Sequence, residues 1–366
     1  MKSEWRTITL GEACSRLSSG KGISADLIKP SGSYPVYGGN GLRGYTDAPN
    51  FEGACAIIGR QGAFCGNVRF FRGTAYMTEH AVVAVAAPNN NTRYLAYLLS
   101  TMNLGRLSGQ SAQPGLSVKT LAKQVIELPS KEIQDRIAAL LNSFDEKIEL
   151  NKEINDNLLQ QAVAIFNTYY DEANEQRTFT SLIHVLGGGT PKTGVAEFWD
   201  GEIPFFTPKD VGSPYTFQTE KYITEVGLDH CNSRLYPKNT SFVTARGTVG
   251  KVSLAGKPMA MNQSCYALAS DYVDPILVYF YVLKAVDSLK HKASGAVFDA
   301  IVTRDFDTET IRVLSAEDAQ AVLESITPMM EAIHSNAEEN MRLSLLRDTL
   351  LPKLMSGEID ISNVQL

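Results

Sequence analysis

The 366-residue sequence has few cysteines and no long hydrophobic run. Its five cysteines are an odd number without a C-x-x-C pair, so neither a disulfide framework nor a zinc or other metal site is expected. No run of eighteen apolar residues occurs, and the first residues are not followed by an apolar signal core. We therefore expect a soluble cytoplasmic protein that has no membrane partner.

Signature motifs of common enzymes are also missing. The phosphate-binding pattern G-x-x-x-x-G-K-[ST] does not occur, and neither do H-E-x-x-H and G-x-S-x-G. The five histidines are scattered along the chain. Glu79 and His80 are adjacent and could form an acid–base pair, but neighbouring residues of a strand point to opposite faces. A hidden enzyme that uses this pair is therefore the weaker alternative, and no catalytic residue is assigned.

The stretch from Ser130 to Tyr170 predicts one long helix. It contains neither proline nor glycine, and Ser130 can act as its N-cap. At about 1.5 Å per residue the helix is roughly 60 Å long and needs a partner helix to cover its apolar face. The residues expected on that face recur at steps of three, four and seven: Ile133, Ile137, Leu140, Leu141, Phe144, Ile148, Ile154, Leu158 and Ile165.

A similar stretch begins 185 positions later, at Ser315. Its heptad positions Val322, Met329, Asn336, Leu343 and Leu350 match Ile137, Phe144, Asn151, Leu158 and Ile165. An asparagine on an apolar seam fixes the register of a coiled coil, and Asn151 recurs as Asn336. Two unrelated amphipathic helices are the alternative to a duplication. Pro328 predicts a kink or a break in the second helix.

Two globular segments alternate with the two helices. Residues 131–177 and 316–366 together carry a net charge of −11, and the remaining residues carry +5, so the overall charge of −6 hides a basic globular part. We predict an α+β protein in which two α/β domains are each followed by a long helix and the helices form an antiparallel coiled coil. The predicted segments are 1–129, 130–177, 178–314 and 315–366.

Each globular segment contains a turn that is rich in glycine and carries an arginine between two expected strands. Arg60 lies in the first turn and Arg246 in the second, which is two residues shorter when the arginines are aligned. Glycine permits a tight turn and close approach of a ligand, and arginine can bind phosphate or guanine. Ordinary β-turns with solvent-exposed arginines are the alternative.

Further polar residues flank these turns or lie on neighbouring glycine-rich loops. Asparagine and glutamine can bind adenine in a bidentate manner, and lysine can bind guanine or phosphate. Each is individually compatible with an ordinary surface residue. Including the two arginines, the candidate DNA-binding residues are Lys21, Asn40, Arg43, Arg60, Gln61, Asn67, Gln110, Gln113, Lys192, Lys209, Arg246, Thr248, Lys251, Asn262 and Gln263.

This duplicated order resembles the specificity subunits of type I DNA restriction-modification enzymes over essentially the whole chain. The residues that carry the resemblance are the start at Trp5–Glu12, the two arginine turns, the segment Leu128–Ala138, the glycine loop Gly187–Pro191 and the tail Leu350–Gly357. The proline in the second helix and the shorter second turn depart from the first half.

The resemblance implies that each globular domain is a target-recognition domain for one half of a bipartite, asymmetric site in double-stranded DNA. The helices would act as a spacer that sets the gap between the half-sites and would dock two methyltransferase subunits. S-adenosylmethionine, ATP and magnesium would be bound by those subunits and by an endonuclease (translocase) subunit, with no cofactor in this chain. His80 would be structural or would donate to DNA. The alternative is a coiled-coil scaffold that binds proteins without DNA specificity.

Overall fold

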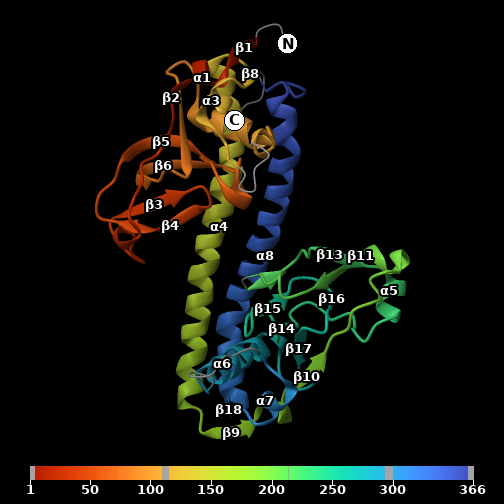
Figure 1. The fold of residues 1–366 in the computed structure, drawn as a ribbon. Coiled ribbons are helices and arrows are strands. Elements are labelled where there is room, and N and C mark those ends of the chain that lie inside the picture. The colour runs from red at the N-terminus through yellow and green to blue at the C-terminus, as the bar shows by residue number, and fades with distance from the viewer. Residues whose placement is uncertain (1–4, 109–114, 213, 293–299, 362–366) are drawn as a thin grey trace. The chain divides into compact units, whose positions relative to one another are not determined.

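The computed structural model describes residues 5–108, 115–212, 214–292 and 300–361. The described chain forms two compact units (Figure 1). The first contains residues 1–148 and 342–366, and the second contains residues 149–341. Each unit therefore combines one globular domain with one end of each long helix. Since these units cut across the helices, the division into four segments stays a prediction.

The first globular domain is built mainly from antiparallel strands. It begins with β1 (Arg6–Thr9) and α1 (Leu10–Ala13), where Thr9 and Glu12 form a capping box. The strands that follow are β2 (Cys14–Ser19), β3 (Tyr34–Gly38), β4 (Gly41–Thr46), β5 (Phe51–Gly59), β6 (Val68–Met77), β7 (Ala81–Ala86) and β8 (Val125–Leu128). The helices between them are α2 (Thr92–Thr101) and α3 (Val118–Ala122).

The six-stranded sheet of this domain, in the order β2-β7-β5-β6-β3-β4, is strongly curled. Phe51 at the start of β5 pairs with Ala75 near the end of β6, and Gly59 at the end of β5 pairs with Ala81 at the start of β7. A flat β5 would hold these two points about 26 Å apart, yet only the short turn 78–80 joins β6 to β7. The curl brings that turn to the end of β5.

The second globular domain repeats this plan with additional strands. Its strands are β9 (Glu175–Thr178), β10 (His184–Gly187), β11 (Trp199–Phe206), β12 (Tyr215–Thr216), β13 (Lys221–Ile223), β14 (Ser241–Thr244), β15 (Val252–Ala255), β16 (Ala260–Met261), β17 (Cys265–Ala269) and β18 (Thr310–Val313). Its helices are α5 (Glu225–Asp229), α6 (Pro275–Lys292) and α7 (Thr303–Asp307). A five-stranded sheet has the order β10-β17-β14-β15-β12, and a three-stranded sheet has the order β13-β11-β16.

Backbone pairing shows that the two domains share one topology. A short antiparallel pair joins the two ends of each domain, β1 with β8 in the first and β9 with β18 in the second. The parallel pairing of β3 with β6 in the first domain recurs as that of β11 with β16 in the second. The amide of Leu10, which follows β1, donates to the carbonyl of Gln124. In the same way the amide of Phe179, which follows β9, donates to the carbonyl of Glu309. The duplication predicted from the helices therefore extends to the globular domains.

Two long helices follow these domains. Helix α4 spans Lys131–Glu172 and helix α8 spans Ala316–Met355. The Ser130 hydroxyl lies 3.5 Å from the amide of Ile133, and the Ser315 hydroxyl accepts from the amide of Asp318 at 3.1 Å. Both serines thus lie at the predicted caps, and Ser315 has the shorter contact.

A kink or a break was predicted at Pro328, and the break does not occur, because α8 continues through this residue. Proline lacks the amide that would donate to the carbonyl four residues earlier. The flanking side chains Val322, Ile326, Met330 and Ile333 are all fully buried in the core of the second unit. Burial stabilises by about 1.5–3 kcal/mol for each large apolar side chain. Four such side chains, on both sides of the proline, therefore outweigh the lost hydrogen bond.

Polar pairing fixes the register of the two helices within the second unit. The Asn151 side-chain amide donates to Oδ1 of Asn340 at 2.9 Å, and that of Asn336 donates to Oδ1 of Asn155 at 2.8 Å. The helices therefore run antiparallel there, as predicted. Ile154 does not lie on the buried face as expected, since 38% of it is exposed while Asn151 and Asn155 are buried.

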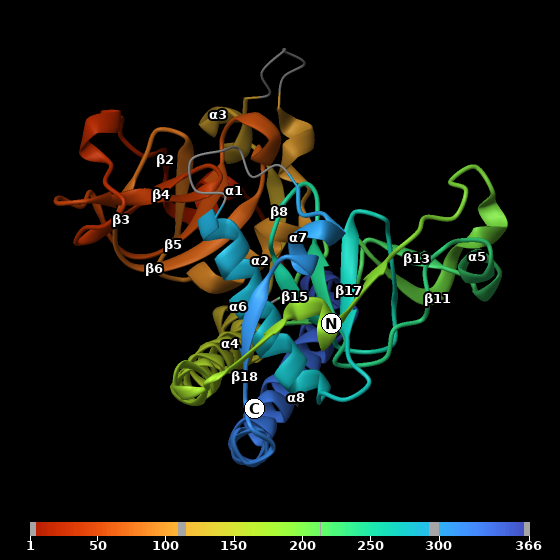
Figure 2. The ribbon, with the colours of Figure 1, turned by 90° about the horizontal axis from the view of Figure 1, so that it is seen from below.

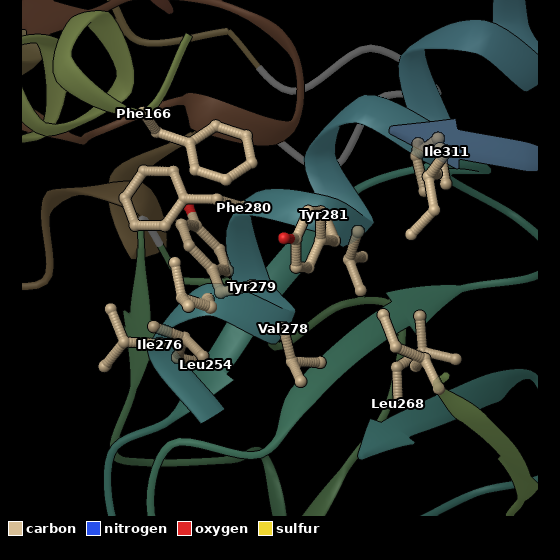
Figure 3. Packing of buried hydrophobic residues seen from close by; sticks show 14 of the residues in the cluster. Phe166, Leu254, Leu268, Ile276, Val278, Tyr279, Phe280, Tyr281 and Ile311 are labelled. Atoms are coloured by element: carbon tan, nitrogen blue, oxygen red, sulfur yellow. The ribbon is translucent and has the colours of Figure 1, made fainter. Parts of the chain in front are cut away.

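Each unit has its own apolar core. In the second unit Phe166 of α4 stacks on Phe280 of α6 with ring centroids 5.3 Å apart, and Tyr281 meets Phe166 edge-on (Figure 3). In the first unit the end of α8 and the following Ile361 pack with Ile137 and Leu141 of α4. Seen from below, α6 lies between the sheet strands and α4 within the second unit (Figure 2). The long helices are thus integral parts of both cores.

Candidate nucleic-acid interface

The turn after β5 is held by backbone hydrogen bonds at the end of the first sheet. The Arg60 amide donates to the carbonyl of His80 at 3.0 Å, and the Arg60 carbonyl accepts from the amide of Leu116 at 2.8 Å. The Arg60 guanidinium is half-buried and lies 3.4 Å from the Ser19 hydroxyl and from the Glu79 carbonyl. Arg60 therefore also ties three segments of the sheet end together.

Two more loops meet the Arg60 turn. The Thr78 amide donates to the carbonyl of Tyr37 at 2.9 Å, which brings the β6–β7 turn beside the loop that contains Asn40. The Lys21 amide donates to the carbonyl of Met77 at 3.0 Å. Gly39 lies so close that a β-carbon there would be 2.8 Å from the His80 carbonyl oxygen. Glycine is required at this position because the two backbones approach each other.

Two arginines of the first domain lie against glycines of the β3–β4 hairpin. A β-carbon at Gly38 would lie 2.8 Å from Cδ of Arg43, and one at Gly41 would lie 2.9 Å from a guanidinium nitrogen of Arg69. Arg43 belongs to the predicted set, and Arg69 was missed. The signal that could have found it is its place in the sequence, two residues after the candidate Asn67. Both arginines add positive charge beside the three loops.

The second domain assembles the same three loops. The Ala245 amide donates to the carbonyl of Ser264 at 2.8 Å, which joins the Arg246 turn to the β16–β17 turn. The Thr248 hydroxyl donates to the carbonyl of Pro208 at 3.2 Å, which joins it to the loop that carries Lys209. The Thr190 hydroxyl donates to the Gln263 side chain. Lys209 forms an exposed contact of 3.3 Å with Glu220, an ion pair of small energetic weight.

These hydrogen bonds correct the expected match between the two arginines. The bond from the Ile301 amide to the Ala245 carbonyl repeats the bond from Leu116 to Arg60, so Arg60 corresponds to buried Ala245. Gln61 pairs with Gly115 as Arg246 pairs with Ala300, so Gln61 is the counterpart of Arg246.

The glycines of the turns show the same correspondence. Gly62 and Gly247 both have positive φ, and so do Gly66 and Gly250. The second turn is therefore shorter by one residue, whereas alignment of the arginines gave two. That alignment failed because the register of each turn is set by hydrogen bonds to distant residues, which the local sequence does not reveal.

Asn67 and Lys251 occupy equivalent positions at the foot of the two turns. The Asn67 carbonyl accepts from the amide of Gly59, and the Lys251 carbonyl accepts from the amide of Thr244. Both residues line a hollow between the turn and the helical segment that follows β7 or β17, and Lys290 shares the hollow of Lys251. They therefore border the loop clusters on the helix side.

Most of the predicted residues lie on the surface. Those that are exposed are Lys21, Asn40, Arg43, Gln61, Asn67, Lys192, Lys209, Arg246, Thr248, Lys251 and Gln263. Arg60 and Asn262 are half-buried, and the Asn262 side chain accepts from the amide of Ser264 at 3.0 Å. Gln110 and Gln113 lie outside the described residues.

Glu79 and His80 are closer than expected. Their side chains approach to 3.2 Å because both residues lie in a turn, where the strand rule for opposite faces does not hold. Nearby, burial raises the pKa of the Cys65 thiol, which donates to the Arg60 carbonyl at 3.4 Å and is therefore a poor nucleophile.

The described residues were also considered for metal ligands and for membrane-spanning helices, and they contain neither. No group of three acidic, histidine or cysteine residues that could hold a metal ion occurs among them. Within the same residues no helix has the length and apolar character needed to span a membrane.

The family described as the type I restriction modification DNA specificity domain matches this sequence twice, over residues 2–160 and 172–342. The chain belongs to this family. The two matches contain the two globular domains with their loop clusters, so the duplicated architecture corresponds to two specificity domains in one chain. The family is named for DNA specificity. The exposed polar side chains of the loop clusters are the candidates for that contact.

Some members of the family are similar to a part of this chain, and others are similar to most of it. The EcoprrI specificity subunit of Escherichia coli is 43% identical over 146 residues, which span 39% of this chain and 36% of that protein. The HindI specificity subunit of Haemophilus influenzae is 22% identical over 327 residues, which span 67% of this chain and 71% of that protein. The match to the first relative thus spans about a third of its length.

A solved structure has the same fold. The crystal structure of a type I restriction-modification S subunit from M. genitalium superposes with a TM-score of 0.64 at 17% identity and covers 96% of each chain. At this identity the likeness concerns the fold alone. The predicted fold class is thereby confirmed.

Proposed function

We propose that this chain is the DNA-recognition subunit of a type I restriction-modification complex. Each globular domain reads one half of a bipartite, asymmetric site in double-stranded DNA, and the chain itself catalyses no reaction. The observation that carries this proposal is the repeated cluster of three loops, which has the same backbone hydrogen bonds in both domains but different polar side chains at its surface. The same backbone arrangement with different surface side chains is what recognition of two different half-sites requires.

The chemistry of the clusters suits base and phosphate contacts. The first cluster exposes Lys21, Asn40 and Gln61, and the second exposes Lys209 and Arg246. Lysine and arginine attract the phosphate backbone, whereas asparagine, glutamine and arginine can form bidentate hydrogen bonds with base edges. Two modules joined in one chain also gain affinity, because the first to bind raises the effective concentration of the second.

The long helices have two roles in this proposal. They set the distance between the half-sites, and their exposed faces dock two methyltransferase subunits and further endonuclease subunits. Adenine methylation and DNA cleavage would then occur on those partners, which would bind S-adenosylmethionine, ATP and magnesium. The acidity of the segments 131–177 and 316–366 disfavours direct contact of the helices with DNA phosphates.

Selection from a pool of random DNA duplexes tests this function. The chain is purified together with the host proteins that accompany it, and the bound duplexes are sequenced after several rounds. The proposal expects enrichment of one split motif with a fixed gap. The alternative, a coiled-coil scaffold, expects that the chain retains its protein partners while the bound duplexes stay as random as the starting pool.

A further inference from the structure

We propose that Gln61 and Arg246 are equivalent specificity-determining residues, so that Gln61 reads an adenine in one half-site and Arg246 reads a guanine at the corresponding position of the other. This inference rests on the proposed function. Beyond that function, one position in each domain selects one base pair of the site.

The equivalence depends on four backbone features that coincide in the two turns. The residue before Gln61 donates to the carbonyl of His80 and accepts from the amide of Leu116. The residue before Arg246 likewise donates to the carbonyl of Ser264 and accepts from the amide of Ile301. Gln61 pairs with Gly115 and Arg246 pairs with Ala300. The residues that follow are Gly62 and Gly247, with φ of 75° and 81°. The side chains of Gln61 and Arg246 therefore start from equivalent positions of the same backbone arrangement.

Both side chains are free to contact a ligand. Gln61 and Arg246 are exposed, and neither side chain has a hydrogen bond or an ion pair within the part of the chain that the structure describes. The space beside the next residue is also open. A β-carbon at Gly62 would meet no atom within 4 Å, and one at Gly247 would meet only Cβ of Pro208 at 3.8 Å. A nucleic acid can therefore approach the turns closely.

The neighbouring turn residues differ from this pair in their surroundings. Arg60 is half-buried with contacts to Ser19 and Glu79, and its counterpart Ala245 is buried. The residue at that position thus packs within the end of the sheet in both domains. One residue later, both domains place a polar side chain without a hydrogen bond among the described residues at the surface. These side chains differ in type, as expected where two half-sites differ in sequence.

The chemistry of the two side chains assigns the bases. A glutamine amide offers one donor and one acceptor side by side, which matches N7 and the amino group of adenine. An arginine fork offers two donors, which match O6 and N7 of guanine. Because the two domains share one frame, this difference between the side chains becomes a difference between A·T and G·C at equivalent distances from the centre of the split site.

A reciprocal exchange tests the assignment in the host. A strain that lacks the chain is complemented with the wild type, Gln61→Arg or Arg246→Gln, and its methylated adenines are mapped. We expect Gln61→Arg to change one position of one half-site from A·T to G·C, and Arg246→Gln to change one position of the other half-site from G·C to A·T. Each change should be a shift in preference of about tenfold to a hundredfold.

Controls separate this proposal from the function on which it rests. Lys238→Gln removes a charge at the opposite end of β14 and should leave the motif unchanged, while Gln61→Ala should relax the same single position. Equal weakening of all sites by either exchange would make the residue a phosphate contact and overturn the proposal, as would an unchanged motif in a folded variant. If the wild type itself directs no split motif, the proposed function fails instead.

Discussion

Asn151 donates a hydrogen bond to Asn340, and Asn336 donates one to Asn155, at 2.9 and 2.8 Å. Asn151 and Asn336 are equivalent by sequence, and so are Asn155 and Asn340, each pair being 185 positions apart. Exchange of the two helices therefore converts one hydrogen bond into the other. An antiparallel pair of duplicated helices has this local twofold relation, and its polar residues specify the register.

Replacement of Asn151 by leucine should destabilise the second unit. The amide of Asn340 and the carboxylate of Glu339, which now accept from Asn151, would lose that donor at the helix seam. We expect a loss of about 1–3 kcal/mol in the free energy of unfolding, measured by urea denaturation. The double variant with Asn340→Leu should recover part of it. Asn157→Leu on the exposed face is the matched control, and an equal loss there would contradict the role of the seam.

The positive φ of Gly62 predicts a local cost for any side chain at that turn. Gly62→Ala would force alanine into the left-handed region at φ of 75°, which costs roughly 1–2 kcal/mol. Under the proposed function it should also weaken recognition of one half-site only. Gly22→Ala is the control, because Gly22 has no positive φ and a β-carbon there would meet nothing within 4 Å. Equal thermal stability of the two variants would refute the assigned strain.

The sequence predicted the general architecture because helical periodicity and glycine-rich turns are local signals. It did not predict the continuity of α8, since the burial around Pro328 depends on the tertiary core. It also aligned Arg60 with Arg246, because residue type was the available guide and the hydrogen bonds to His80 and Ser264 are made over long sequence distances. Exposure of the candidate residues could be predicted from their glycine-rich context, whereas the pairing of Gln61 with Arg246 required the fold.

Burial predicts unreactive thiols in the folded protein. It raises the pKa of Cys14, Cys55 and Cys265 to about 12, so almost no thiolate forms at pH 8. Titration with a thiol-reactive chromophore should leave these three unmodified, while half-buried Cys231 reacts, and denaturation should expose all five. Rapid modification of all five in the native protein would contradict this burial.

These thiols also make stability depend on pH. Their pKa values are higher in the folded state than in the unfolded state, so the stabilisation is complete below the unfolded-state pKa. It is lost as the pH rises from there toward 12, because only the unfolded chain releases protons. The denaturation midpoint should fall above about pH 8.5. Cys55→Ala should reduce that fall, and an identical slope in this variant would exclude a contribution of Cys55.

Lengthening of both long helices should change the gap in the recognised site. One heptad inserted after Ile148 of α4, and one inserted after Met341 of α8, preserves the apolar period and adds about 10 Å to each helix. That length corresponds to about three base pairs of duplex DNA. Selected duplexes should keep both half-sites but show a longer gap. A wild-type gap in a folded variant would refute the role of the helices as a spacer.

The most direct test of the account is a genome-wide map of methylated adenines in the host, with and without this chain. If the two domains read two half-sites for a methyltransferase, one split and asymmetric motif should be methylated in the wild type and lose its methylation when the chain is removed. Reintroduction of the chain should restore that motif. A map in which every methylated motif persists without the chain, although an active methyltransferase copurifies with it, would contradict the central claim.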